Sequence, residues 1–141
     1  MKKAFTMIEL IFVIVIIGIL SAVAIPKLGS TVEQAYMVKG KNTLSIVRSA
    51  IATERQKGIL KGSFGNISIY NAAGRVFTKF TDVNGSRILD HDLDDCVTTG
   101  CWHTTNDVTY TFYRDAGNCT YALVANRFVD QTVGGCTDLE D

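Results

Sequence analysis

The chain has 141 residues, 47% of them hydrophobic, and a formal net charge of zero, which suits one small domain with an appendage. The charge is unevenly spread: residues 58–141 contain six Lys or Arg and eleven Asp or Glu, whereas the preceding residues contain eight and three. An acidic C-terminal region disfavours direct binding of nucleic acid, which needs several cations directed at phosphates. The sequence has no Gly-x-Ser-x-Gly, phosphate-binding loop or His-Glu-x-x-His motif, so an enzyme is not expected.

The first element is an apolar run from Phe5 to Ile25 that contains one charged residue, Glu9. A helix of this length extends roughly 31 Å, about the thickness of the hydrocarbon core of a membrane. Lys2 and Lys3 precede the run and favour a cytoplasmic N-terminus. A carboxylate within a bilayer costs about 2.5–3.5 kcal/mol, so Glu9 is expected to have both a partner and a function.

Two simpler interpretations of this run remain open. Ala22-Val23-Ala24 is similar to a signal-peptidase site, and cleavage after Ala24 would release a soluble secreted domain with a binding or enzymatic role. Against this, the run is long for a signal peptide and carries Glu9 near its start. In a plain single-pass anchor, Glu9 would only lower stability in the membrane.

The start of the chain, MKKAFTMIEL, resembles the leader and processing site of type IV prepilins. This family includes the pilins of type IV pili and the pseudopilins of type II secretion and DNA-uptake systems. The resemblance implies cleavage between Ala4 and Phe5 by a prepilin peptidase, with N-methylation of the new amine of Phe5. Glu9 and Pro26 also match the family, whereas Ala4 occupies a position where the family usually has Gly.

The same resemblance gives Glu9 a role in assembly. Cleavage would create a cationic amine at Phe5, and Phe5 and Glu9 are spaced i,i+4, so they can pair within one chain. In the family, the Glu is thought to meet the amine of the neighbouring subunit. A misplaced subunit would then leave a buried charge unpaired, which would select the correct register.

The helical pattern continues beyond the apolar run. Gly18 and Pro26 are expected to weaken the helix, and the resemblance implies local melting between them during assembly; a kinked but intact helix is the alternative. Lys57-Gly58 is a typical helix end. The sequence therefore predicts a leader at 1–4 and one long interrupted helix at 5–57, with a transmembrane half at 5–25. Apolar residues recur along its second half at spacings of three or four: Val32, Tyr36, Gly40, Leu44, Val47 and Ile51.

Residues 58–141 are predicted to form an extracytoplasmic globular domain rich in short strands. Alternation and turn residues predict strands at Ile67–Tyr70 and Arg75–Thr81, an Asn84-Gly85 turn, and a hairpin formed by Val108–Tyr113 and Cys119–Ala125. The expected fold class is α+β. A long N-terminal helix would pack on a small antiparallel β-sheet domain with disulfides, as in pilins.

All four cysteines, Cys96, Cys101, Cys119 and Cys136, lie in the last third of the chain and predict two disulfides in an oxidising compartment. A zinc site using Cys96, Cys101 and His103 would match no common structural pattern. Three disulfide pairings are possible, and the sequence does not choose between them. We favour Cys96–Cys101 and Cys119–Cys136, because short sequential loops are the easiest to close. The second would fasten the tail to the hairpin, as the C-terminal disulfide does in many pilins.

A cluster of carboxylates is the main polar feature of this domain: Asp90, Asp92, Asp94 and Asp95. Their alternation resembles a calcium loop, but it lacks the turn glycine and the final Glu of an EF-hand. Some secretion pseudopilins bind calcium in this region, so calcium is retained as an alternative to a solvated acidic loop. Trp102 is expected either to form an exposed binding anchor or to cover the neighbouring disulfide.

These features predict a structural subunit of a type IV pilus-like filament or a type II secretion-type pseudopilus, assembled through its N-terminal helix. Expected partners are copies of itself, other pilins, the prepilin peptidase and an inner-membrane assembly platform. The expected location is the bacterial inner membrane, crossed once with the N-terminus in the cytoplasm, and later a periplasmic or extracellular filament. The sequence does not distinguish secretion, adhesion, twitching and DNA uptake.

Overall fold

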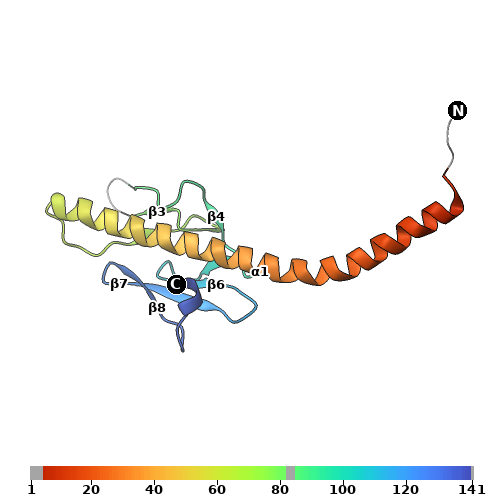
Figure 1. The fold of residues 1–141 in the computed structure, drawn as a ribbon. Helices are drawn as coiled ribbons and strands as arrows, with labels where there is room; N and C mark the ends of the chain where they lie inside the picture. The colour runs from red at the N-terminus through yellow and green to blue at the C-terminus, as the bar shows by residue number, and fades with distance from the viewer. Residues whose placement is uncertain (1–4, 82–84, 141) are drawn as a thin grey trace. The chain divides into compact units, whose positions relative to one another are not determined.

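A computed structural model describes residues 5–81 and 85–140 of the chain. It divides into two compact units between Gln34 and Ala35, and each unit is treated by itself. One long helix and small antiparallel sheets confirm the predicted α+β fold class (Figure 1). The elements are α1 (Met7–Leu60), β1 (Ile69–Tyr70), β2 (Arg75–Val76), β3 (Lys79–Phe80), β4 (Leu93–Asp94), β5 (Trp102–Thr104), β6 (Thr109–Phe112), β7 (Cys119–Val124), β8 (Arg127–Asp130) and α2 (Thr137–Glu140).

The first unit is the part of α1 that ends at Gln34. The helix continues through Gly18 and Pro26 without a break, so the structure corresponds to the intact alternative rather than to an interrupted helix. Proline removes a single backbone donor, and the helical turns on either side retain their own hydrogen bonds. A Cβ atom placed on Gly18 would meet nothing within 4 Å. No packing within the described chain therefore requires a glycine at this position.

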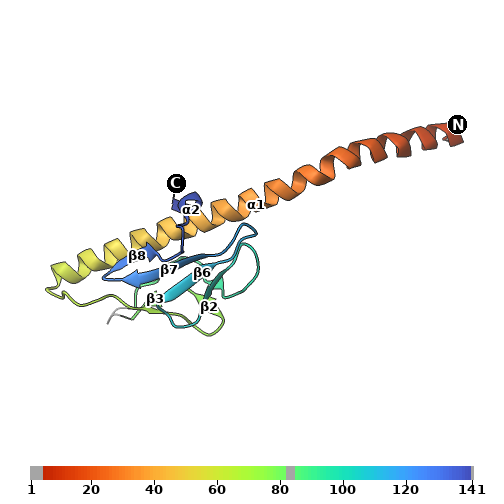
Figure 2. The same cartoon turned by 90° about the horizontal axis from the view of Figure 1, so that it is seen from below.

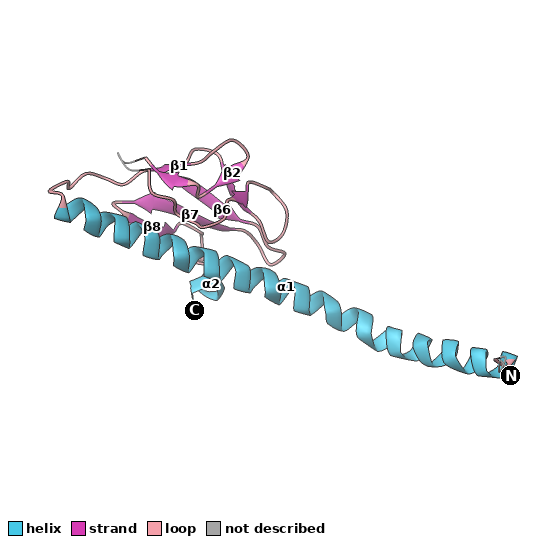
Figure 3. Cartoon of the chain, turned by 90° about the horizontal axis from the view of Figure 1, so that it is seen from above, coloured by secondary structure: helices cyan, strands magenta, loops and turns pink. Residues whose placement is uncertain are grey.

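The second unit has the later part of α1 packed against a layer of strands (Figure 2, Figure 3). Its main sheet is antiparallel, with the order β5-β6-β7-β8. The predicted hairpin is confirmed as β6 and β7, in which Tyr110 is paired with Tyr121. The alternation of side chains along these strands directs one set toward the helix. Leu44, Val47 and Ile51 of α1 are buried against this set.

The core beneath α1 is dominated by aromatic side chains. Trp102 is only 1% exposed and lies near Phe77 and Phe112, with ring centroids 5.4 and 5.1 Å away. Phe77 in turn stacks on Tyr110 at 4.4 Å. The interpretation of Trp102 as an exposed binding anchor was therefore wrong. It is a central core residue, because its place in β5 directs the indole into the domain.

The predicted strand at Arg75–Thr81 is split into β2 and β3 by Phe77, whose φ is 54°. Two side chains from this region, those of Asn71 and Thr78, accept hydrogen bonds that stabilise the irregular backbone. The amide of Phe77 donates to Asn71 Oδ1 at 2.6 Å, and the amide of Ala72 donates to Thr78 Oγ1 at 3.1 Å. These bonds replace a continuous strand ladder, so β2 pairs with β4 and β3 pairs with β1.

The predicted Asn84-Gly85 turn begins outside the described residues, because Asn84 is not among them. The segments on either side of it are joined by backbone hydrogen bonds. The amide of Phe80 donates to the carbonyl of Ser86 at 2.9 Å, and the amide of Ile88 donates to the carbonyl of Thr78 at 3.4 Å. The described segments on the two sides are therefore antiparallel, as the bridge between Lys79 and Arg87 also shows.

Two disulfides link Cys96 to Cys101 and Cys119 to Cys136, the pairing favoured from the sequence. The second disulfide is buried and connects the start of β7 to the segment before α2. Asp130, at the end of β8, organises this segment, since its carboxylate accepts the amides of Thr132 at 2.7 Å and Cys136 at 2.6 Å. The C-terminal tail is therefore held by both a covalent bond and a carboxylate.

Candidate assembly site

The start of α1 has a capping arrangement at Thr6. The hydroxyl of Thr6 accepts the amide of Glu9 at 3.3 Å, and its carbonyl accepts the amide of Leu10 at 3.3 Å. The Thr-x-x-Glu spacing is the sequence pattern of a capping box, which could have identified this helix start from the sequence. Glu9 thereby lies in the first turn of α1, where a carboxylate interacts favourably with the helix dipole.

The first half of α1 exposes an almost uninterrupted apolar surface. Every large apolar side chain from Phe5 to Leu28 is at least 40% exposed. The helix is long and apolar enough to cross a membrane, by its length and composition. Phe5 is 80% exposed and lies just before the helix, four residues from the exposed Glu9. This surface lacks cover within its own unit and suits either lipid or the helices of other copies.

The processing and weak-point residues of the prediction are placed only in part. Ala4 lies outside the described residues, while Phe5 is the first described residue. Gly18 and Pro26 lie inside the continuous helix. The structure thus brings Phe5 and Glu9 onto the same end of the first unit and leaves Gly18 and Pro26 further along it.

The carboxylates considered for calcium are directed to separate partners. Asp92 pairs with Arg87 at 2.6 Å, Asp94 pairs with Arg75 at 2.7 Å, and Asp95 contacts His103 Nδ1 at 2.6 Å. Asp90 is exposed. Within residues 5–81 and 85–140, no group of three or more His, Cys, Asp or Glu could hold a metal ion. Calcium binding therefore stays a prediction without a visible ligand set.

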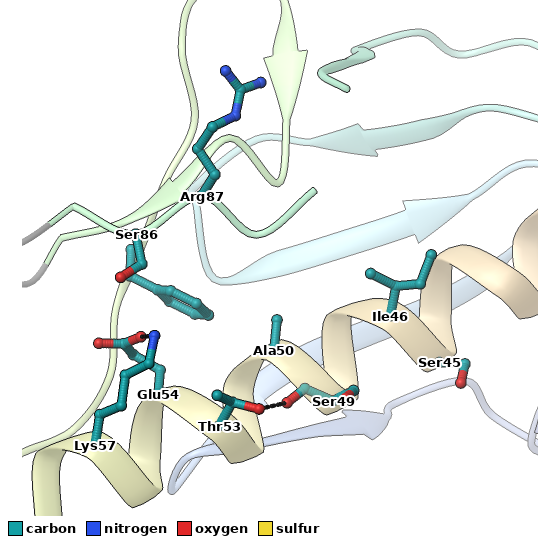
Figure 4. A pocket seen from close by; sticks show the side chains of 10 residues that line it. Ser45, Ile46, Ser49, Ala50, Thr53, Glu54, Lys57, Ser86 and Arg87 are labelled. Carbon is teal, nitrogen blue, oxygen red and sulfur yellow. Dashed lines mark hydrogen bonds and ion pairs between the residues drawn. The ribbon is translucent and has the colours of Figure 1, made fainter. Parts of the chain in front are cut away.

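A groove of about 420 Å³ runs between α1 and the segment around Ser86 (Figure 4). Its helix side carries small hydroxyls and the ion pair between Glu54 and Lys57, which are 3.1 Å apart. Thr53 Oγ1 donates to the carbonyl of Ser49 at 2.9 Å. The residues that line it include hydroxyl groups but no histidine.

The opposite flank of α1 carries a second groove of about 530 Å³, here called the arginine groove, which the sequence analysis missed. Three arginines line it: Arg48 and Arg55 from α1, and Arg127 at the start of β8. Ile51, Ile59 and Phe128 contribute apolar wall. Only the fold brings Arg127 next to the helix, so no local sequence pattern could have predicted this cluster.

Of these three arginines, Arg48 alone has a side chain that forms an ion pair or hydrogen bond with another described residue. It forms an ion pair with Glu140, donates to the carbonyl of Phe128 at 3.1 Å, and lies 5.8 Å from the ring centroid of Tyr121. Burial raises the pKa of Tyr121 to about 12, and the charges of Asp130 and Glu140 act in the same direction. Tyr121 is therefore a neutral core residue at ordinary pH rather than an acid.

Comparison with known proteins finds a match at the N-terminal end of the chain. A family model described as the prokaryotic N-terminal methylation motif matches residues 1–25. The chain is 51% identical over 59 residues to the type IV narrow pilus major component PilA5 of Thermus thermophilus, over 40% of this chain and 51% of that protein. It is 39% identical over 57 residues to a fimbrial protein of Moraxella nonliquefaciens, of which 37% is covered. These two alignments span about half or less of the relatives' length.

A longer alignment extends the likeness beyond the N-terminus. The type IV major fimbrial protein FimA of Dichelobacter nodosus is 30% identical over 154 aligned positions, which cover all of this chain and 91% of that protein. No solved structure matches the chain. The processing motif, the exposed apolar helix and this full-length alignment together show that the chain belongs to the type IV pilin family.

Proposed function

We propose that this chain is a structural subunit of a type IV pilus-like filament and assembles through the first half of α1. The observation that carries the proposal is the exposed apolar surface from Phe5 to Leu28, which has no cover within its own unit. In a membrane this surface contacts lipid, and in a filament it packs against the same surface of neighbouring copies. Alignment with one major fimbrial protein over the whole chain supports the same role.

Processing by a prepilin peptidase between Ala4 and Phe5 is part of this proposal, as is methylation of the new amine. The family motif over residues 1–25 supports it. Before assembly, the helix would cross the inner membrane once with Lys2 and Lys3 on the cytoplasmic side. An assembly platform would then move the subunit into a periplasmic or extracellular filament. Surface pilus and secretion pseudopilus are both compatible with this mechanism.

Glu9 would specify the register of assembly. It lies in the first turn of α1 and is exposed, so its carboxylate is available to an amine on another copy. Within a filament this contact would lie among apolar helices, where an unpaired carboxylate is strongly disfavoured. A subunit is thereby stabilised in the position that pairs its carboxylate.

The test is to replace Glu9 with Gln or Leu in filament-forming cells and to count sheared filaments by electron microscopy. We expect filaments to become far less abundant while the full-length protein remains in the membrane. Normal filament number and length would contradict the pairing. Mass spectrometry of the mature N-terminus separates the proposal from secretion, because methylated Phe5 supports a pilin and Ile25 supports a released soluble domain.

A further inference from the structure

The second unit carries opposite charges on the two flanks of α1. Figure 1 shows β4 on one side of the second half of this helix and β8 on the other. On the first side, Asp90 lines a hollow with Thr43 and Ile46. On the second side, the arginine groove includes Arg55 and Arg127. The first side, here called the acidic flank, carries the exposed Asp90 near the ion pair between Arg87 and Asp92, and the second, basic flank carries Arg55 and Arg127; the two flanks face away from each other.

The charges on both flanks are available to an outside partner. Arg55 and Arg127 are exposed and have no carboxylate partner among the described residues. Asp90 is likewise exposed, with no ion pair in the same part of the chain. The neighbouring Asp92 is engaged only in a surface ion pair, which contributes about 0–1 kcal/mol and can exchange partners.

We infer that the acidic flank around Asp90 binds the arginine groove of a second copy of this chain. Carboxylates and guanidinium groups form charge-assisted, often bidentate hydrogen bonds, and the apolar wall of the groove would exclude water from them. The face of α1 between the flanks carries Ser45, Ser49 and Ala52, which add no charge that would oppose the approach. The inference rests on the proposed function, since it describes how copies join in the filament.

The contact also specifies a symmetry. Because the two patches differ and lie on opposite flanks, the contact is head to tail, and head-to-tail contacts that do not close produce open helical assemblies. Asp90 lies beside Ile46, and Arg55 is nine positions further along α1. Pairing them displaces the second copy by roughly 14 Å along the helix axis. A two-fold symmetric dimer cannot form through this contact.

Cysteine cross-linking in purified filaments tests the contact directly. All four native cysteines are in disulfides, so no native free thiol competes when two introduced thiols are oxidised to a disulfide. The double variant Arg55→Cys/Asp90→Cys should give a ladder of covalent multimers on mild oxidation, whereas each single variant should give none. The control Arg55→Cys/Ala116→Cys uses an exposed turn residue outside the proposed contact and should give no ladder.

Reversing the charges at the contact is a second test. Arg55→Glu with Arg127→Glu should reduce filament number on the order of tenfold, because like charges would face each other across the contact, and adding Asp90→Lys should restore it. Double-variant filaments that form normally but give no ladder, or single variants that give dimers, would overturn the contact alone. Absence of wild-type filaments would contradict the proposed function as well.

Salt-sensitive micromolar binding of DNA that the arginine variants abolish would assign the groove to nucleic acid and overturn the contact.

Discussion

At Gly40 the backbone of α1 lies against side chains of the layer beneath it. A Cβ atom at this position would lie 2.8 Å from Leu139 Cδ2 and 2.8 Å from two ring carbons of Phe112. Contacts this short force the neighbouring groups to move, and Phe112 is fully buried. Glycine is therefore required here by packing, although the helix itself would favour almost any other residue.

We expect Gly40→Val to lower the free energy of unfolding by about 1–3 kcal/mol through overpacking. Trp102 is the single tryptophan and is buried, so its fluorescence can follow urea unfolding of the detergent-solubilised chain. Gly29→Val is the matched control, because a Cβ there meets nothing within 4 Å. Equal midpoints for the two variants would show that the contact at Gly40 relaxes without loss.

Asp130 links the acid stability of the domain to its C-terminal segment. Burial by itself would raise the pKa of Asp130, but hydrogen bonds from Thr132 and Cys136, together with the charge of Arg48, outweigh it and hold the pKa below its ordinary value of 3.8. The ionised form is thus favoured in the folded state. Its stabilisation is complete above pH 3.8 and is lost as the pH falls through the lowered pKa.

Replacing Asp130 with Asn should lower the free energy of unfolding at pH 7 by about 1–3 kcal/mol, because one backbone amide loses its acceptor. The difference from the unmodified chain should shrink as the pH falls below 3.8 and be smallest below the lowered pKa of Asp130, where both side chains are neutral. Denaturant titrations at several pH values measure this. Asp90→Asn, at an exposed position, should show no such difference, and a gap that persists in acid would assign the effect to something other than ionisation.

The positions and contacts of single residues were the hardest features to predict from the sequence. The left-handed backbone of Phe77 depends on a hydrogen bond to Asn71, six positions earlier, and not on any turn-forming residue at Phe77 itself. Trp102 could not be assigned to the core from its neighbours, because its burial follows from the pairing of β5 with β6. The arginine groove has the same origin in tertiary structure.

Among the elements, α1 and the β6–β7 hairpin were predictable because each has a strong local signal. The helix has a long apolar run followed by apolar residues at spacings of three or four. In the hairpin, strand-forming residues alternate on both sides of a turn. The helix end was predicted near Lys57 and lies at Leu60, within the usual uncertainty of helix boundaries. Strands β4, β5 and β8 and helix α2 were missed because they are short and depend on their partners.

The two disulfides should contribute unequally. Their cysteines are 17 residues apart in Cys119–Cys136 and 5 apart in Cys96–Cys101. In the chain-entropy model, the longer loop gives about 3 kcal/mol and the shorter about 2 kcal/mol. Replacing Cys119 and Cys136 with Ser should therefore lower the melting temperature more than replacing Cys96 and Cys101. The reverse order would show that local strain, rather than loop length, dominates.

At the scale of the whole molecule, the proposed assembly surface and the folded domain lie in different units, which divide between Gln34 and Ala35. All the buried core residues lie after it, between Leu44 and Leu139, whereas the exposed apolar helix lies before it. A fragment of residues 35–141 should therefore fold without the first half of α1 and form no filaments, since the apolar assembly surface is missing. Circular dichroism and size-exclusion chromatography measure both properties, and an unfolded fragment would show that the domain needs the missing helix.

The position of the Thr6 cap has a consequence for maturation. The first described hydrogen bonds of α1 are accepted by Thr6, the second residue after the proposed cleavage point. A peptidase could therefore remove the leader, with its two lysines, without breaking any of these hydrogen bonds. Maturation would therefore remove two positive charges from the end of the chain while leaving the described hydrogen bonds of the first helical turn in place.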